Sequence, residues 1–461
     1  MKKKKILLLS DDLRMSSGVG TVSKEFVIGT IDRYDWVQMG GAIKHPDEGK
    51  VIDMRDAIKE EEGKDGYLKI YPVSGYGNPE TLRSILRIEK PDAIMIYTDP
   101  RFWMWLFQME RELRYNIPIF YYAIWDDLPD PMWNAPFYES CDLIMSISKQ
   151  STGIHKRVLE KAGADLSKTN VTYVPHGINS ESFRPVDDTD GEFTQFKEEL
   201  QKDKEYSFIV YYNNRNIRRK NPGDVIMSFK TFVETLPEDE QKKCALVMHT
   251  HPVDNNGTDL PAVAEAMAPD LNVIFSGGKL DIPQMNFLYN VADVTINIAS
   301  NEGFGLGTAE SLMAGTPVVV NVTGGLQDQC GFKYKNKYLT ADDYYSIKSL
   351  HDKRKWKNND DLTWGEWVKP VWPACRSLQG SVPTPYIFDD RTDFIEVAEK
   401  LREWYDTSKS DRDKKGLMGR QWMMNDDIYL SSVGMCERFI EDMDEKFENW
   451  QPRSNFDLVE V

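Results

Sequence analysis

The chain has 461 residues, more than one hydrophobic core usually organises, so we expect two domains. Hydrophobic residues make up 41% of it and aromatic residues 11%, which excludes global disorder. With 57 Lys and Arg against 74 Asp and Glu, the net charge is −17, which disfavours broad attraction to nucleic acid or anionic lipid.

The chain begins with a basic run at residues 2–5 and an apolar run at residues 6–9. The apolar run is shorter than the core of a secretory signal, about 7 to 15 residues, and no stretch reaches the ~18 apolar residues of a membrane span. We interpret the basic run as a solubilising start to a buried strand rather than as a membrane or nucleic-acid tag. Five scattered cysteines without a CxxC pair predict neither disulfides nor a zinc site, which favours a cytoplasmic protein.

The first part of the chain alternates short apolar runs with longer segments of helical period. A helix is expected at residues 20–30, and the expected strands are residues 6–10, 93–97, 117–123, 143–146 and 171–174. This alternation is typical of a parallel sheet, so residues 1–185 are predicted to form a Rossmann-like domain.

The second part repeats the pattern after a charged stretch at residues 184–205. The expected strands are residues 208–212, 245–250, 273–276, 294–298 and 317–321. We therefore predict a second doubly wound domain at residues 186–425. Between about residues 331 and 386 the rhythm is lost, and we interpret this segment as an insertion outside the sheet.

A glycine-rich segment lies between a predicted strand and a predicted helix of the second domain. Its glycines, Gly303, Gly305 and Gly307, suit a loop whose backbone N–H groups hold a phosphate at a helix start. Glu302 and Glu310 bracket the loop, and carboxylates accept strong hydrogen bonds from sugar hydroxyls. The alternative is a tight turn with a solvated glutamate.

Arg215 and Lys220 follow the first strand of the second domain, five residues apart. Fixed cations stabilise a diphosphate leaving group as it gains negative charge, and they do so without a metal. An exposed basic loop or a contact to nucleic acid is the alternative interpretation.

Together these two motifs resemble the retaining glycosyltransferases of family 4, which carry an E-x7-E element and an R-x4-K pair. The resemblance implies the GT-B architecture, with two facing Rossmann-like domains and a C-terminal helical segment, here residues 426–461, that returns to the first domain. It also implies that Glu302 binds the transferred sugar and Glu310 the donor ribose. The donor site would be completed by Phe304, Gly305, Leu306, Gly307 and Thr308, and catalysis would rest on Glu302, Arg215 and Lys220.

In the first domain the resemblance is looser. Gly18 and Gly20 follow the first strand and open a helix, and the corresponding loop of the family faces the donor phosphates. His176 lies in a turn near the predicted boundary, where we favour a hinge or capping role over catalysis. Because His249 and His251 have no third ligand at a suitable spacing, no metal is expected.

Many family members end a first-domain strand with a His-Asp pair near the acceptor. This chain has Trp125 in the position of the histidine, followed by Asp126. A tryptophan cannot transfer a proton, but its ring can stack on a sugar or a base, and Asp126 can bind a hydroxyl. Asp99, at the end of another strand, is a third acceptor-side candidate.

The resemblance implies a hexosyl- or pentosyltransferase that uses a nucleotide-diphosphate-sugar as co-substrate, without cofactor or metal, and retains the anomeric configuration. The acceptor hydroxyl could belong to a glycan, a small molecule, a lipid-linked compound or nucleic acid. The alternatives are a nucleotide-sugar epimerase or phosphorylase of GT-B fold, a DNA-modifying glycosyltransferase, and a non-catalytic nucleotide-sugar or glycan-binding protein.

Overall fold

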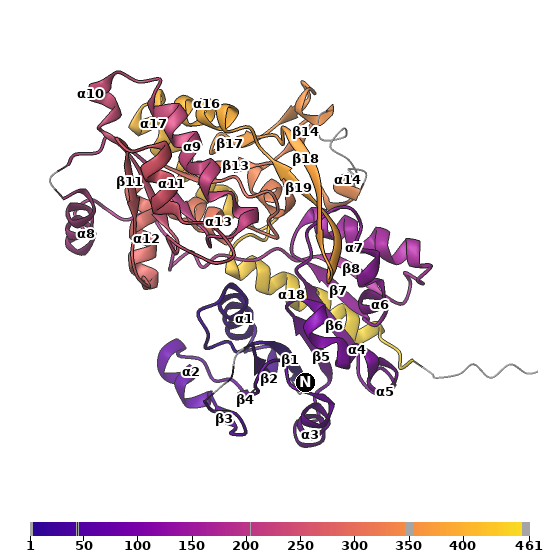
Figure 1. The fold of residues 1–461 in the computed structure, drawn as a ribbon. Helices are drawn as coiled ribbons and strands as arrows, with labels where there is room; N and C mark the ends of the chain where they lie inside the picture. Colours follow the sequence, from indigo (N-terminus) through magenta and orange to yellow (C-terminus); the bar gives the residue numbers. More distant parts are fainter. Residues whose placement is uncertain (1–2, 43, 45, 203, 346–354, 454–461) are drawn as a thin grey trace, which may run out of the picture. The chain divides into compact units, whose positions relative to one another are not determined.

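The computed structural model describes residues 3–42, 44, 46–202, 204–345 and 355–453, and the chain divides into two compact units (Figure 1). The first unit contains the chain up to Trp125, the segment Asp130–Gly177 and the chain from Ser432 onward. The second contains Asp126–Pro129 and Ile178–Ser431.

The first unit is built on an eight-stranded sheet in the order β3-β4-β2-β1-β5-β6-β7-β8, parallel except for the pairing of β3 with β4. Its strands are β1 (Lys4–Asp11), β2 (Tyr34–Gly41), β3 (Ile52–Asp53), β4 (Leu68–Pro72), β5 (Ala93–Tyr97), β6 (Ile119–Ala123), β7 (Leu143–Ser146) and β8 (Asn170–Tyr173). Its helices are α1 (Gly18–Gly29), α2 (Arg55–Glu62), α3 (Pro79–Glu89), η1 (Pro100–Trp103), α4 (Met104–Gln108), α5 (Glu110–Leu113), η2 (Met132–Asn134), α6 (Ala135–Glu139), α7 (Lys149–Ala162) and α18 (Ser432–Asn449).

The second unit is built on a parallel six-stranded sheet in the order β11-β10-β9-β12-β13-β17, with two small antiparallel sheets, β15-β14-β16 and β18-β19. Its strands are β9 (Phe208–Asn213), β10 (Cys244–His249), β11 (Asn272–Phe275), β12 (Val294–Asn297), β13 (Val318–Asn321), β14 (Lys333–Tyr334), β15 (Lys337–Tyr338), β16 (Leu362–Thr363), β17 (Val368–Val371), β18 (Cys375–Ser381) and β19 (Thr384–Arg391). Its helices are α8 (Gly191–Gln201), η3 (Arg218–Lys220), α9 (Pro222–Val233), α10 (Glu238–Gln241), α11 (Leu260–Met267), α12 (Ile282–Val291), α13 (Leu306–Ala314), η4 (Gly324–Cys330), α14 (Ala341–Tyr345), α16 (Phe394–Tyr405) and α17 (Lys409–Met423).

The predicted α/β class with two doubly wound parallel sheets is confirmed. The central strands are continuous apolar runs because helices cover parallel sheets on both faces. In β1, for example, Ile6 to Leu9 are fully buried. Strands β2 and β4 were not predicted, because polar residues such as Gln38 and Lys69 interrupt their apolar runs.

The segment at residues 331–386 is not wholly outside the sheet, so that prediction is wrong for β17. Val368–Val371 pairs in parallel with β13 and forms an edge of the six-stranded sheet. Pro370 made these residues look unlike a strand, but an edge strand tolerates proline because one side of its backbone needs no ladder hydrogen bonds. The part of the prediction at residues 346–354 lies outside the described residues.

The units also differ in extent from the predicted domains. The N-terminal part of the first unit extends to Gly177, whereas the predicted domain extended to residue 185. The residues after Gly177 form hydrogen bonds within the second unit. The Ile178 N–H donates to the Leu430 carbonyl (3.0 Å), and the Arg184 N–H donates to Asn286 Oδ1 (3.0 Å). The short segment 126–129 also groups with the second unit.

The C-terminal helix α18 groups with the first unit, where it packs against α1. The Phe439 ring lies 4.9 Å from Phe26 and 4.7 Å from Tyr122, between centroids. The C-terminal segment that belongs to the first unit begins at Ser432, whereas the predicted returning segment began at residue 426. No helix in the described part of the chain is long and apolar enough to span a membrane.

Candidate functional site

The glycine-rich loop of the second unit connects β12 to α13. Gly305 precedes the helix with φ +91°, a left-handed conformation that favours glycine over any residue with a Cβ atom. Gln329 of η4 donates from Nε2 to the carbonyls of Phe304 (2.7 Å) and Gly305 (3.1 Å). The loop is therefore held by a buried amide.

The start of α13 presents backbone N–H groups that the helix itself does not use. Among the described residues no side chain caps this helix, although Thr308 donates its hydroxyl to the Gly305 carbonyl at 2.9 Å. The first N–H groups of a helix have no intrahelical acceptor, and the helix dipole adds positive potential there. The backbone at Leu306 and Gly307 can therefore accept an anion, as the sequence predicts.

Lys220 and Glu302 form an ion pair beside this loop. Both side chains are nearly buried, with exposed fractions of 8% and 11%. Burial lowers the pKa of the Lys220 ammonium to about 8, although Glu302 opposes that shift. Burial alone would raise the pKa of Glu302, but Lys220 and Arg219 lower it overall, so the carboxylate is ionised at neutral pH.

Arg219 is a residue that the sequence analysis missed. Its guanidinium donates to the Asn301 carbonyl (Nη1, 2.6 Å), and its charge helps to lower the pKa of the adjacent Glu302. The run Arg218, Arg219, Lys220 was visible in the sequence, but spacing alone does not reveal which side chain of a short 3-10 turn faces the carboxylate.

Arg215 is placed differently from Lys220. Its side chain is 62% exposed, and its Nε lies 3.4 Å from Asp254 Oδ2. The structure thus brings Lys220 and Arg219 to Glu302 and leaves Arg215 at the surface of the same unit.

Glu310 lies on α13 and accepts a hydrogen bond from the Tyr289 hydroxyl at 2.6 Å. That hydroxyl in turn accepts from Asn213 Nδ2 at 2.7 Å. Burial raises the pKa of the Glu310 carboxyl, with Tyr289 opposing the shift. Gly307 leaves room for this arrangement, because a Cβ there would lie 3.0 Å from the Asn213 carbonyl oxygen. Tyr289 and Asn213 were also missed by the sequence analysis.

The segment Asp126–Pro129 lies against the same site within the second unit. Asn301 donates from Nδ2 to Asp127 Oδ1 (2.5 Å), and the Phe388 N–H donates to the Leu128 carbonyl (2.6 Å). Burial raises the pKa of Asp126, and its charge interacts with Arg219 and Glu302. The structure therefore places Asp126, a predicted acceptor-side residue, in the electrostatic field of Glu302.

The glycine loop of the first unit has different partners. Ser17 caps α1 by accepting from the Gly20 N–H at 3.0 Å, and its hydroxyl donates to Asp11 Oδ2 at 2.9 Å. Gly20 is buried, and a Cβ there would lie 2.5 Å from the Met15 carbonyl oxygen, whereas Gly18 is exposed. The Gly20 N–H is thus occupied by a side chain of the chain itself.

The other two acceptor-side candidates lie together in the first unit. The Asp99 carboxylate accepts from Arg101 Nε at 2.9 Å, and the Arg101 guanidinium lies 5.9 Å from the Trp125 ring centroid. Trp125 also meets Trp133 edge to face, at 5.5 Å. Asp99 and Trp125 are therefore linked through Arg101, a residue that the sequence analysis did not single out.

Two of the histidines singled out in the sequence form hydrogen bonds within the fold. His176 is buried, with Nδ1 2.6 Å from the Tyr122 hydroxyl and Nε2 3.3 Å from that of Tyr97, and burial lowers its pKa to about 3. His249 bonds through Nδ1 to Ser276 Oγ (2.8 Å). In the described ranges, no group of three or more His, Cys, Asp or Glu side chains is arranged to hold a metal ion.

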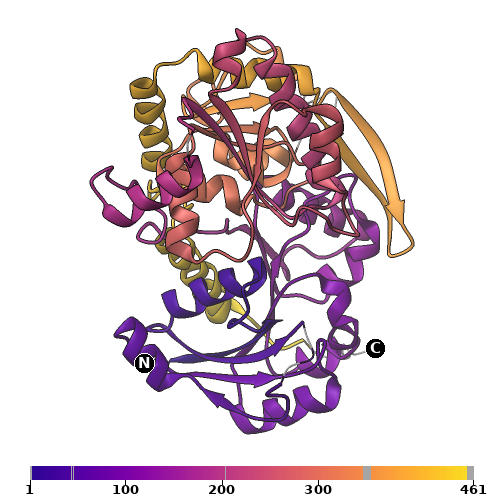
Figure 2. The same cartoon turned by 60° about the vertical axis from the view of Figure 1, so that its left-hand side comes forward.

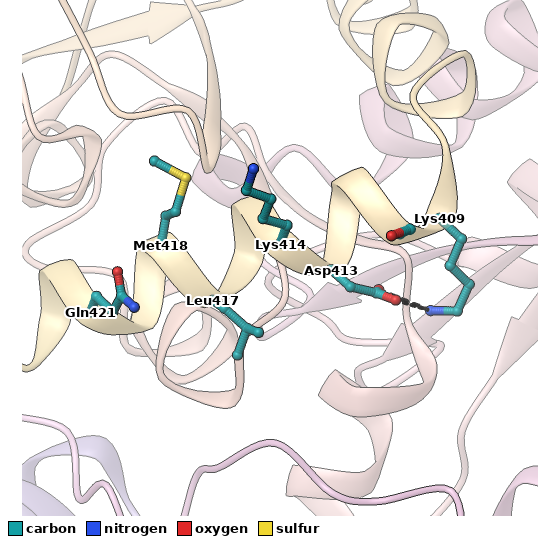
Figure 3. Close-up of a pocket in the computed structure, with 7 residues that line it drawn as sticks. Lys409, Asp413, Lys414, Leu417, Met418 and Gln421 are labelled. Atoms are coloured by element: carbon teal, nitrogen blue, oxygen red, sulfur yellow. Dashed lines mark hydrogen bonds and ion pairs between the residues drawn. The ribbon is translucent and has the colours of Figure 1, made fainter.

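One large hollow lies elsewhere, along α17 (Figure 3). It has a volume of about 730 Å³, and all of its lining residues belong to that single helix, where Lys409 Nζ lies 2.9 Å from Asp413 Oδ1. Its lining includes none of the predicted site residues, and no chemistry is assigned to it.

A comparison with protein families matches part of the chain. Residues 192–361 match a family described as glycosyl transferases group 1, and this range contains Arg215, Lys220, Glu302 and Glu310. No curated protein sequence gives a significant match.

Solved structures of similar fold cover nearly the whole chain. A glycosyltransferase from Rickettsia africae has a TM-score of 0.63 at 13% identity, covering 97% of this chain and 100% of its own. Sucrose-phosphate synthase from Thermosynechococcus elongatus has a TM-score of 0.66 at 14% identity, with coverage of 97% and 100%. HepE of Anabaena, solved with UDP and glucose, has a TM-score of 0.62 at 11% identity, with coverage of 96% and 100%.

Residues 192–361 thus resemble the group 1 glycosyl transferases, and the chain as a whole shares the GT-B fold of the solved structures. The match falls on the unit that holds the Lys220–Glu302 pair and the uncapped start of α13.

Proposed function

We propose that the protein transfers a hexosyl or pentosyl group from a nucleotide-diphosphate-sugar to an acceptor hydroxyl, with retention of the anomeric configuration and without a metal. The observation that carries this proposal is the ion pair of Lys220 with Glu302 beside the uncapped start of α13. A cation, a carboxylate and free backbone N–H groups are the three partners that a diphosphate-linked sugar needs.

Each partner has a distinct task in this proposal. The start of α13 and Lys220 bind the diphosphate, and Arg219 adds positive charge. When a donor phosphate replaces Glu302 as the ion-pair partner of Lys220, the ionised Glu302 can accept hydrogen bonds from sugar hydroxyls. Glu310, held by Tyr289, binds the ribose. Arg215, as its motif implies, turns from Asp254 toward the diphosphate when the donor is bound.

In the transfer step, the bond between the anomeric carbon and the diphosphate oxygen breaks while the acceptor oxygen bonds to that carbon on the same face. The proton of the acceptor hydroxyl passes to the departing phosphate, so a histidine in the position of Trp125 is not needed. Lys220 stabilises the charge that develops on the leaving group more than it stabilises the ground state.

The test begins with a panel of nucleotide-diphosphate-sugars, scored by the rise in melting temperature that a specific ligand causes. UDP-glucose comes first, because HepE, which shares the fold, binds UDP and glucose. Mass spectrometry of products with an acceptor panel then identifies the acceptor. The anomeric coupling of the product, measured by NMR, decides between retention and inversion.

The same assay separates the other hypotheses. Donor consumption without an acceptor favours an epimerase, and a strict requirement for phosphate favours a phosphorylase. Donor binding without turnover favours a non-catalytic binding protein. Transfer of the sugar to DNA favours a DNA-modifying enzyme. If no nucleotide-sugar stabilises the protein, the proposal is wrong.

A further inference from the structure

The β18–β19 hairpin is a prominent feature of the second unit that the proposed function does not use. Its strands pair with each other as a separate two-stranded sheet, and Figure 2 shows it as a long orange ribbon that projects from the unit. Leu378 and Val382 are 64% and 98% exposed, so the hairpin does not serve to bury a core.

The base of this hairpin is nevertheless tightly fixed. The Asp390 carboxylate accepts from Arg376 Nη2 (2.9 Å) and from the Thr323 hydroxyl (3.2 Å). The Asp390 N–H donates to the Ser300 carbonyl (3.1 Å), and its own carbonyl accepts from Asn321 (2.8 Å). The hairpin is thus a rigid arm, anchored two residues before Glu302.

A groove of about 420 Å³ lies between this arm and the loop that carries η3. Its volume falls in the range of roughly 300 to 1,000 Å³ that is usual for small-molecule sites. The groove is lined mainly by polar side chains, among them Asn221, Thr258, Ser377, Gln379, Asp389 and Arg391. The hairpin and the η3 loop each supply one wall.

The charges in the groove cancel. Arg218 pairs with Asp389, and Arg391 donates from Nη2 to Asp224 Oδ2 at 2.5 Å. An anion entering the groove would meet two carboxylates, and a cation would meet two guanidinium groups. The groove therefore favours a neutral ligand that forms many hydrogen bonds.

Asp389 adds a second indication of a ligand. Its side chain is 2% exposed, and Oδ2 bonds to Arg218, while Oδ1 is buried and has no hydrogen-bond partner among the described residues. Leaving such an acceptor unsatisfied costs free energy. Asp389 also lines the groove, so a rotation of its carboxylate that exposed Oδ1 would let a ligand hydroxyl remove that cost.

We propose that this groove binds a neutral carbohydrate, through hydroxyl groups that bond to Gln379, Thr258 and Asp389. The site is distinct from the donor site, but the two share η3, which presents Arg218 to the hairpin and Lys220 to Glu302. The hairpin also touches the donor loop directly, because the Phe388 carbonyl accepts from Asn301 Nδ2 at 2.6 Å.

The proposal is tested on the full chain, without any nucleotide-sugar, by titration calorimetry with maltotriose, cellotriose and mannotriose. At least one of these trisaccharides should bind, and Gln379→Ala and Thr258→Val should each weaken its binding about fivefold, the effect of one lost hydrogen bond. Leu378→Ala is the matched control, because Leu378 lies between Ser377 and Gln379 on the strand and points to the opposite face.

Two further arms keep the result specific. Glu302→Gln should retain trisaccharide binding, and loss of binding in that variant would place the sugar in the donor site and overturn the proposal. Trigalacturonate should bind more weakly than the neutral trisaccharides. The proposal is also overturned if none of the three neutral sugars binds, or if Gln379→Ala and Leu378→Ala behave alike. Because no donor is present, failure of the proposed transferase activity does not affect this result.

Discussion

Each unit opens a helix with a glycine loop directly after a buried parallel strand, but the two loops use their polar groups differently. In the first unit Ser17 caps α1 by accepting from the Gly20 N–H. In the second unit α13 starts without a side-chain cap among the described residues, with Lys220 and Glu302 beside it. A glycine pattern therefore indicates a tight turn in both units, and the proposed anion site of the second unit rests on its charged neighbours.

The largest effect is expected from removing the cation. Lys220→Met should lower the rate of transfer about 10²- to 10³-fold, because the variant loses a preorganised positive charge that stabilises the leaving group. The rate is measured as nucleoside diphosphate released in the presence of acceptor. Lys243→Met, which breaks an exposed ion pair with Glu240 in the same unit, should leave the rate unchanged.

A fold defect could imitate that result, so the ion pair needs a double variant. Lys220→Met or Glu302→Gln alone leaves a nearly buried partner unpaired and should destabilise the protein by up to about 3 kcal/mol. The double variant should recover most of this stability in urea unfolding but remain inactive. A stable, fully active double variant would contradict the assignment.

The next effect is a dependence on pH. Because burial lowers the pKa of Lys220 to about 8, its ammonium is present below that pH and is lost above it. We expect kcat/KM to fall about tenfold per pH unit well above pH 8. Lys220→Arg keeps its charge in this range, so its profile should stay flat there. A profile that rises through pH 9 in the wild type would exclude a cationic role.

A smaller effect is expected at the second glutamate. Tyr289→Phe removes the hydroxyl that holds Glu310 and should raise the Kd of the donor about five- to tenfold, since one hydrogen bond to a charged group is lost. Tyr405→Phe, which removes a similar bond to Glu240, is the control and should not change the Kd. If the donor Kd were the same in both variants, the proposed role of Glu310 in donor binding would be wrong.

The smallest effect is expected in the loop of the first unit. Ser17→Ala removes the cap of α1 and should lower the free energy of unfolding by about 1 kcal/mol. Thermal unfolding measures this loss. If Ser17→Ala instead left stability intact and abolished donor binding, the contrast between the two loops would be reversed.

The sequence predicted those strands whose residues are all apolar, because such residues are stable only in a buried position. Strands such as β5 and β6 are continuous apolar runs, and these were found as expected. β17 was missed because Pro370 is unfavourable in a strand interior yet tolerated at an edge. The β18–β19 hairpin was missed because β18 is largely exposed and neither strand alternates regularly between apolar and polar residues.

At the site, the sequence identified the acidic and basic motifs but not their partners. The contacts of these partners depend on where their side chains point, which is set by the packing of the turn and the helix. The partners are Arg219, Tyr289 and Asn213. Asp126 lies 176 positions before Glu302 in the sequence, and only the folded structure shows that the segment 126–129 groups with the second unit. Such contacts have no local sequence signal.

The most direct test of the central claim is the donor affinity of Lys220→Met, measured by titration calorimetry with the nucleotide-sugar that most stabilises the wild type. Wild type and Ser17→Ala should bind this donor with similar Kd values, and Lys220→Met should raise the Kd at least tenfold, about 1.4 kcal/mol. An unchanged Kd in Lys220→Met, together with a large loss of affinity in Ser17→Ala, would contradict the account.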